Sequence, residues 1–294
     1  MVARPRRSVL YMPGSNAKAI AKARMLPADA IILDLEDSVA PDAKAAARAQ
    51  VVEAVREGGF GPREVIIRIN GPHTPWGEDD LIAAIAAAPD GILLPKVDGP
   101  GDIMHAARAL RDARAPERVR LWAMMETPNA ILGAGSIAAT RADPTARLEV
   151  LVMGLNDLSK ETRARLSPGR AAFLPWLTTC VVAARAHGCD ILDGVYNDIK
   201  NLDGFRAECE QGREMGLDGK TLIHPGQLDI CNEVFAPSPP EIESARAIID
   251  AFSRPENVGK GVIQLDGKMV ELLHAQMARR TLAIAEGIAA LKAA

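Results

Sequence analysis

The stretch Ala30-Ile-Ile-Leu-Asp-Leu-Glu-Asp-Ser38 is an apolar run that ends in a group of acidic side chains. A strand that is apolar on both faces is typical of a parallel sheet covered by helices. The acidic residues after the run predict that polar side chains lie at the carboxyl end of this strand. The same pattern recurs along the chain and decides the fold class.

Eight such runs alternate with helical patterns, most of which end at Gly or Pro. The expected strands are Ser8–Tyr11, Ala30–Leu35, Glu64–Ile69, Gly91–Pro95, Arg120–Met125, Val150–Met153, Asp190–Asp193 and Gly219–Ile223. The expected helices are Asp42–Glu57, Asp80–Ala88, Gly101–Ala113, Arg170–His187 and Leu202–Met215. This alternation favours the α/β class and a (β/α)8 TIM barrel. The alternative is an open doubly wound sheet, but no GxGxxG motif follows the first strand.

The barrel pattern ends near Phe235, so we expect a barrel over residues 1–235 and an extension over residues 236–294. The extension begins with a Pro-rich linker, Ala236–Pro240, and continues with a helix that has one apolar face. A Gly-rich turn region, Asn257–Lys268, and a final helix from about Val270 to Lys292 complete this small helical extension. So short a segment folds poorly alone, and we expect it to pack on the barrel or on a neighbouring subunit.

The overall charge is nearly balanced, because 35 Lys and Arg residues face 38 Asp and Glu residues in a chain of 294. Nucleic-acid binding is not expected, since there is no dense basic stripe. There is also no apolar run of the ~18 residues that a membrane span needs. The apolar stretch behind the basic N-terminus is too short for a signal peptide, so we expect a cytoplasmic protein. The four cysteines lack CxxC spacing and are expected to be reduced thiols.

Polar residues follow six of the eight expected strands, and in a barrel these ends meet at one rim. Glu126 and Asp157 follow neighbouring strands, five and six. Two carboxylates so placed suit Mg²⁺, which binds one or two protein carboxylates and keeps its other positions for water and substrate. Alternatively, both carboxylates pair with Arg68 and Lys96 in a structural charge network.

Arg68 ends strand three, and its guanidinium suits a substrate carboxylate or an oxyanion. The alternatives are that it is the partner of the acidic group at residues 34–37, or that it serves in both roles. The loop Met12–Asn16 precedes a helix with two lysines, a combination that can bind phosphate. His224 ends strand eight and is either a structural residue or a substrate contact.

Eight segments, taken in order, are similar to one known family. They are Arg7-Ser-Val-Leu-Tyr-Met-Pro-Gly-Ser15, Asp34-Leu-Glu-Asp-Ser-Val39, Arg68-Ile-Asn70, Leu94-Pro-Lys-Val97, Glu126-Thr-Pro128, Gly154-Leu-Asn-Asp-Leu158, Asp218-Gly-Lys-Thr-Leu-Ile-His-Pro225 and Leu265-Asp-Gly-Lys-Met269. Together they resemble the citrate lyase beta-subunit-like family, the HpcH/HpaI aldolase/citrate lyase group, over roughly residues 6–275. Three further segments, Leu121–Thr127, Asp193–Asn197 and Ala207–Arg213, look most like its (3S)-malyl-CoA thioesterase branch.

The resemblance implies a TIM barrel that binds Mg²⁺ through Glu126 and Asp157, with Arg68 on the substrate oxygens. It places acyl-CoA contacts on Tyr11, Asn16, Lys22 and the backbone near Asn156, Ile223 and His224. It also implies that Asp266 is the catalytic acid/base and reaches the rim of an adjacent subunit. The implied assembly is a homotrimer, or a hexamer built as a dimer of trimers. From the residues alone, Asp266 reads as a turn residue before Gly267.

The function that the resemblance implies is a Mg²⁺-dependent carbon–carbon lyase on malyl-CoA-like thioesters, giving acetyl-CoA and glyoxylate or a related small 2-oxo acid. The alternative is a thioesterase that hydrolyses (3S)-malyl-CoA to malate and CoA. Further alternatives are a citrate lyase beta subunit acting on an acyl-carrier protein, an aldolase of free pyruvate and a non-catalytic barrel. Leu155 stands where the family more often has Thr, which leaves the acyl group open.

Overall fold

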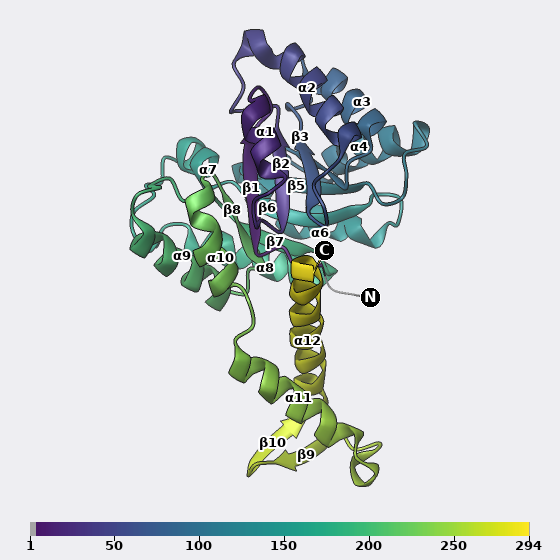
Figure 1. Cartoon of the computed structure of the whole chain (residues 1–294), viewed down its shortest axis with the longest axis vertical. Coiled ribbons are helices and arrows are strands. Elements are labelled where there is room, and N and C mark those ends of the chain that lie inside the picture. The colour runs from purple at the N-terminus through teal and green to yellow at the C-terminus, as the bar shows by residue number, and fades with distance from the viewer. Residues whose placement is uncertain (1–3, 294) are drawn as a thin grey trace. The chain divides into compact units, whose positions relative to one another are not determined.

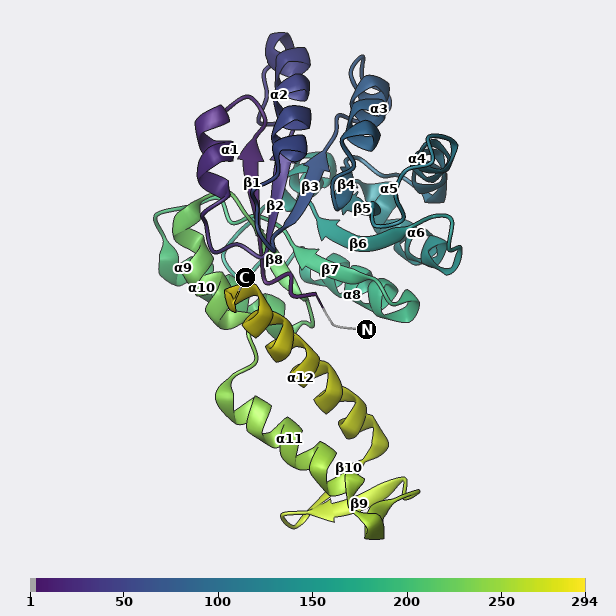
Figure 2. The same cartoon turned by 45° about the vertical axis from the view of Figure 1, so that its right-hand side comes forward.

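The computed structural model describes residues 4–293 and divides into two compact units, one formed by Arg6–Val234 and one formed mainly by the segment from Phe235 onward. In the first unit, eight parallel strands pair in chain order, and β1 also pairs with β8 to close the ring (Figures 1 and 2). This closure confirms the expected (β/α)8 barrel and excludes the open sheet. The strands are β1 (Ser8–Pro13), β2 (Ala30–Asp34), β3 (Glu64–Arg68), β4 (Gly91–Leu94), β5 (Arg120–Met125), β6 (Leu148–Met153), β7 (Asp190–Asp193) and β8 (Gly219–Leu222).

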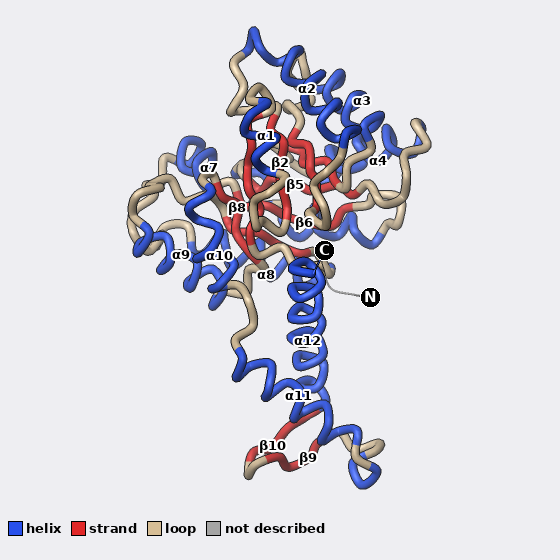
Figure 3. The backbone as a smooth tube through the Cα atoms, viewed as in Figure 1, coloured by secondary structure: helices blue, strands red, loops and turns tan. Residues whose placement is uncertain are grey.

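Helices surround the ring of strands (Figure 3). They are α1 (Ala17–Ala23), α2 (Lys44–Glu57), α3 (Gly77–Ala87), α4 (Pro100–Asp112), α5 (Pro128–Leu132), α6 (Ala134–Ala139), α7 (Leu155–Thr162), α8 (Leu174–His187), α9 (Leu202–Glu214) and α10 (Leu228–Val234). Short 3₁₀ turns add η1 (Pro41–Ala43), η2 (Thr140–Ala142) and η3 (Pro225–Gln227). The five helices listed from the sequence all form, with ends shifted by up to four residues, whereas α5, α6, α7 and α10 were not expected.

The barrel interior is filled by alternate residues of the strands, since successive side chains of a strand point to opposite faces. The buried residues of this core are Val9, Ala30, Ile32, Ile66, Leu93, Trp122, Met124, Val150, Val152 and Leu192, with Tyr11 packed against them. Counting on by two from Val9, Ile32 and Ile66 reaches Tyr11, Asp34 and Arg68. The inward-facing positions thus change from apolar to polar as the strands approach their carboxyl ends.

At the amino end of the strands, a buried cation joins four elements. The Arg6 guanidinium hydrogen-bonds Glu64 on β3 at 2.8 Å, Glu149 on β6 at 2.6 Å and Asp190 on β7 at 2.6 Å. It also lies 5.3 Å from the centre of the Trp122 ring on β5. These charge-assisted bonds fix the relative positions of strands that are far apart in the sequence.

The second unit contains α11 (Pro239–Ser253), η4 (Pro255–Asn257), β9 (Val262–Leu265), β10 (Lys268–Glu271) and α12 (Leu272–Ala293). Two expectations need correction. Pro239 begins α11 rather than lying in a linker, because the Ser238 hydroxyl accepts from the Glu241 N–H and caps the helix. The expected turn region is instead an antiparallel hairpin, β9–β10, in which Ile263 and Val270 pack on Ala251.

Two smaller observations concern the described residues as a whole. All four cysteines are free and buried in the structure. No helix in residues 4–293 is both long enough and apolar enough to cross a membrane.

Candidate active site

The carboxyl ends of β2 and β3 place Asp34 and Arg68 side by side, since these residues are register partners. Arg68 donates to Asp34 from Nε at 2.6 Å and from Nη2 at 2.8 Å. Its Nη1 lies 2.9 Å from Glu36 and 3.4 Å from Asp37. Arg68 therefore pairs with the acidic group after strand two, which was one of the alternatives expected from the sequence.

The Arg68 guanidinium is buried and also stacks on Tyr11, with its central carbon 4.8 Å from the ring centre. Although burial opposes ionisation of Asp34, the charge of Arg68 keeps the pKa of this carboxyl below its usual value. Burial raises the pKa of the Tyr11 hydroxyl, which donates to the Met124 sulfur at 3.6 Å. Arg68 is thus a fixed cation with one edge held by Asp34.

Three carboxylates surround the Lys96 ammonium. Its Nζ lies 3.0 Å from Asp157 Oδ1, 3.4 Å from Glu36 Oε1 and 3.6 Å from Glu126 Oε1. Burial lowers the pKa of Lys96, but the charges of Glu126 and Glu36 outweigh that effect and raise it. Burial raises the pKa of Glu36 to about 7 and also raises that of Glu126, whose side chain is 1% exposed.

Lys96 reaches this position through an uncommon backbone conformation. Its φ is +51°, a left-handed value that non-glycine residues adopt rarely and at a cost of about 1 kcal/mol. The conformation lets the Lys96 N–H donate to Glu126 Oε1 at 2.7 Å while the side chain lies beside the same carboxylate. Gly154 leaves space for that carboxylate, because a Cβ at residue 154 would lie 2.6 Å from Glu126 Oε2. Glu126 is therefore held by the loops on either side of it.

The arrangement suits a divalent cation. No group of three or more His, Cys, Asp and Glu side chains in the described chain is arranged to hold a metal by itself. Mg²⁺ needs fewer protein ligands, since one or two carboxylates with water and substrate oxygens suffice. Glu126 and Asp157 both lie within 3.6 Å of the Lys96 ammonium, so the two side chains converge on one positive charge. The alternative charge network is present only in part: Lys96 pairs with both carboxylates, whereas Arg68 pairs with Asp34, Glu36 and Asp37.

The expected CoA contacts belong to β1 and α1 and to the segments after β6 and β8. Tyr11 lies within β1 and Lys22 within α1, while Asn16 precedes α1, where its side chain accepts from the Ala19 N–H at 3.0 Å and caps the helix. Lys22 is exposed in the last turn of α1. The structure shows no direct contact between these two residues and the carboxylates.

Asn156 lies in the first turn of α7, directly after β6, and Ile223 and His224 lie in the loop after β8, the strand that pairs with β1. Sequence reasoning missed Asn197 and Gln227, whose side chains hydrogen-bond these loops. No local pattern marks Asn197, because its partner is 41 residues away, whereas Gln227 follows His224 by three residues, which is the spacing of a capping box. Leu155 is buried against Gly194 rather than exposed toward the carboxylates.

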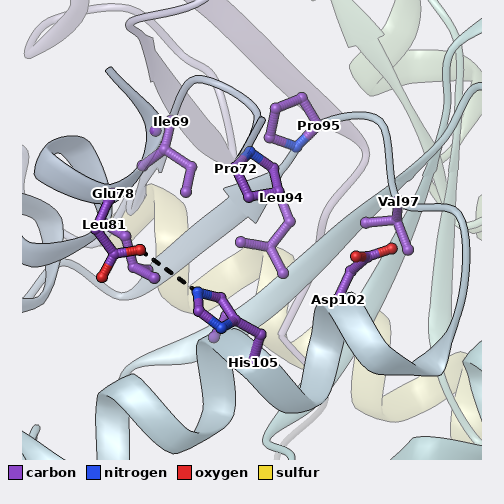
Figure 4. A pocket seen from close by; sticks show the side chains of 11 residues that line it. Ile69, Pro72, Glu78, Leu81, Leu94, Pro95, Val97, Asp102 and His105 are labelled. Atoms are coloured by element: carbon purple, nitrogen blue, oxygen red, sulfur yellow. Dashed lines mark ion pairs between the residues drawn. The ribbon is translucent and has the colours of Figure 1, made fainter. Parts of the chain in front are cut away.

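A small hollow lies between α3 and α4 (Figure 4). Its lining is mostly apolar, with His105 Nε2 3.5 Å from Glu78 Oε2 at one side. Pro95 and Val97 line it, whereas Lys96 between them turns to the carboxylates. The left-handed residue thus separates this apolar hollow from the charged site.

Asp266 lies in the second unit, at the tip of the β9–β10 hairpin. Leu265 pairs with Lys268, so the connection is the two residues Asp266 and Gly267. Their φ values are +48° and +76°, as a type I′ turn requires, and Asp-Gly is a preferred sequence for that turn. The sequence-based reading of Asp266 as a turn residue is therefore correct, and its carboxylate is exposed.

The sequence matches the HpcH/HpaI aldolase/citrate lyase family over residues 7–225. The chain belongs to this family. It is 52% identical over 291 residues to the (3S)-malyl-CoA thioesterase of Cereibacter sphaeroides (strain ATCC 17029), covering 99% of this chain and 98% of that one. It is 34% identical to the Escherichia coli K12 citrate lyase subunit beta, covering 96% and 94%. Both relatives are enzymes, and the expected membership of an enzyme family is confirmed.

A solved structure shares the fold along nearly the whole chain. It is CitE from Mycobacterium tuberculosis in complex with magnesium, acetoacetate and coenzyme A. The TM-score is 0.75 and the identity 27%, and the match covers 97% of this chain and 100% of that chain.

Proposed function

We propose that this enzyme is Mg²⁺-dependent and hydrolyses malyl-CoA-type thioesters to a free acid and CoA. The observation that carries the proposal is the convergence of Glu126 and Asp157 on one cation beside the fixed guanidinium of Arg68. A divalent cation and a guanidinium together recognise the carboxylate and hydroxyl oxygens of a malyl group. The 52% identity to a (3S)-malyl-CoA thioesterase favours hydrolysis as the reaction.

Each residue has a part that its contacts support. Glu126 and Asp157 would hold Mg²⁺, which when bound supplies a Lewis acid for substrate oxygens. Arg68 would stabilise negative charge on the carbonyl oxygen through Nη1, the nitrogen that Asp34 does not hold. Nη1 lies 2.9 Å from Glu36 and 3.4 Å from the exposed Asp37. Asp266 would accept a proton from the attacking water. The water oxygen then bonds to the thioester carbon, and the CoA thiolate leaves and is protonated.

Carbon–carbon cleavage is the second candidate, supported by the citrate lyase beta relatives. In that reaction the 3-hydroxyl loses its proton, the bond between C2 and C3 of the acyl chain breaks, and glyoxylate leaves. Arg68 would stabilise the acetyl-CoA enolate, and Asp266 would protonate its carbon. The same residues serve both reactions, so only the products distinguish them.

We also propose that Asp266 acts at the barrel of a neighbouring copy in a homotrimer, or in a hexamer of two trimers. The segment around its hairpin exposes large apolar side chains that a monomer would leave in water. They are Val258, Val262, Met269, Leu272, Leu273 and Met277, each 47–72% exposed. Sedimentation and native mass spectrometry test the assembly, and a monomer at micromolar concentration would overturn it.

The test of the reaction follows two products from one mixture of enzyme, Mg²⁺ and (3S)-malyl-CoA. The expected result is free CoA thiol and malate in equal amounts, without glyoxylate, and loss of turnover with excess EDTA. Glyoxylate with acetyl-CoA would instead establish the lyase. If neither product forms, the substrate class is wrong. Glu126→Gln is the matched inactive control, since it keeps the shape of the side chain and removes its charge.

A further inference from the structure

Gln227, in η3 directly after β8, joins two loops of the rim. Its side chain is fully buried. Oε1 accepts from the N–H groups of Ile223 and His224, each at 3.2 Å, and Nε2 donates to the Tyr196 carbonyl at 3.1 Å. One carboxamide therefore fixes the backbone after β8 to the backbone after β7.

A second amide contact extends this connection to residues 154–157, the segment after β6 that carries Asp157 and is called the metal loop below. Asn197, next to Tyr196, exchanges two hydrogen bonds with Asn156: Asn197 Nδ2 donates at 2.8 Å and Asn156 Nδ2 at 3.2 Å. Asn156 immediately precedes Asp157, one of the two expected metal ligands. Three successive loops are thus linked in series, from Asp157 to His224.

The chemistry of the link requires glutamine. A carboxamide accepts through its oxygen and donates through its nitrogen, whereas a carboxylate only accepts and an apolar side chain does neither. Buried backbone N–H and C=O groups left without partners are costly, so loss of Gln227 favours movement of both loops toward water. Because Gln227 occupies the Ile223 and His224 N–H groups, these two donors are not available to a substrate.

We propose that Gln227 is a positioning residue that holds the Ile223–His224 segment, an expected acyl-CoA contact, at a fixed distance from the metal loop. The proposal rests on the proposed function for the ligand it names, a CoA thioester whose acid end lies at Mg²⁺. The two ends of such a substrate are bound by different loops, so their relative position determines whether the thioester carbon lies within reach of the reacting groups.

Gln227→Met removes the link, and Gln211→Met is the matched control. Gln211, on α9, also bridges two groups, accepting from Arg170 at 2.8 Å and donating to the Gly169 carbonyl at 3.0 Å, but touches none of the three linked loops. We expect Gln227→Met to raise the KM for (3S)-malyl-CoA and the calorimetric Kd for CoA about tenfold, with Mg²⁺ affinity unchanged within twofold. Gln211→Met is expected to change none of these more than twofold.

Hydrogen exchange gives a readout that needs no substrate. Amides of residues 195–198 and 222–224 are expected to exchange faster in Gln227→Met and at the native rate in Gln211→Met. Unchanged exchange in these loops, or an equal change of CoA affinity in both variants, would overturn the proposal. A native protein that binds CoA but fails to turn over malyl-CoA would contradict the proposed function alone, and the exchange comparison would still decide the role of Gln227.

Two variants guard against a failure of Gln227→Met to fold. Gln227→Glu keeps both accepted bonds and loses the donated one, so its CoA Kd should lie between native and Met values. Asn197→Ala alters an exposed pair and should fold normally, with faster exchange at residues 195–198. Native exchange and native CoA affinity in both variants would overturn the proposal.

Discussion

Arg68 and Asp34 share two parallel hydrogen bonds across neighbouring strand ends, so the guanidinium plane has one orientation at the rim. Lysine at residue 68 would keep the charge but lose the planar fork. We expect Arg68→Lys to lower kcat at least 100-fold, about 2.7 kcal/mol in the transition state, while Mg²⁺ affinity stays within threefold. Steady-state kinetics with a calorimetric Mg²⁺ titration checks this, and near-native kcat would contradict the role of Arg68.

The same pair predicts a pH dependence of stability. Because its pKa is lowered in the folded state, Asp34 stabilises the protein above its unfolded pKa of about 3.9, and this contribution is lost as pH falls through the folded value. Asp34→Asn leaves Arg68 buried without its main partner, which typically costs about 3–5 kcal/mol. Urea unfolding should give a constant gap between native protein and variant from pH 5 to 8. A gap that does not narrow below pH 4 would contradict the assignment.

Lys96 competes with a metal for the same carboxylates. Lys96→Met removes that competitor and leaves the backbone N–H on Glu126, so we expect Mg²⁺ to bind roughly tenfold more tightly, about 1.4 kcal/mol. Calorimetric titration with Mg²⁺ measures the change. Lys160→Met, which removes an exposed lysine on α7 paired with Glu161, is the control and should bind Mg²⁺ as the native chain does. Weaker binding in Lys96→Met would show that Lys96 supports the metal rather than replaces it.

Sharing of the active site between subunits can be tested by mixing two inactive chains. Glu126→Gln and Asp266→Ala are each expected to retain under 1% of native activity. In a cyclic trimer assembled from equal amounts of both, about one quarter of the sites combine an intact Glu126 with an intact Asp266 from the neighbour. Co-expressed chains should therefore recover about a quarter of native kcat. Mixed trimers, verified by native mass spectrometry, that stay inactive would exclude catalysis across the interface.

The barrel could be predicted from sequence because its strands are apolar on both faces, as residues 30–33 are. Short helices such as α5 and α7 were not predicted, because five to eight residues give too little periodicity to recognise a helix. The hairpin strands were not predicted either, because β9 and β10 have only four residues each and most of these residues are exposed. Their Asp-Gly turn was the signal that the sequence did contain.

The site was predictable as a set of residue types and less so as a geometry. Strand order alone placed Glu126 and Asp157 on neighbouring elements. The left-handed backbone of Lys96 depends on the closure of the barrel around Glu126, and nothing local encodes it. The same holds for Arg6, whose acidic partners are 58, 143 and 184 residues away, and for the amide link at Gln227. Such contacts exist only once the chain has folded.

The Arg6 cluster also bears on how such a barrel evolves. It ties strands together at the end opposite the rim, with bonds that involve none of the rim residues. Mutations in the loops after β6, β7 and β8 can therefore retarget the substrate without loosening this clamp. Exchange of those loops by protein engineering should leave Arg6, Glu64 and Asp190 unchanged. Related enzymes can likewise change between hydrolysis and carbon–carbon cleavage while keeping the same contacts at the amino end of the barrel.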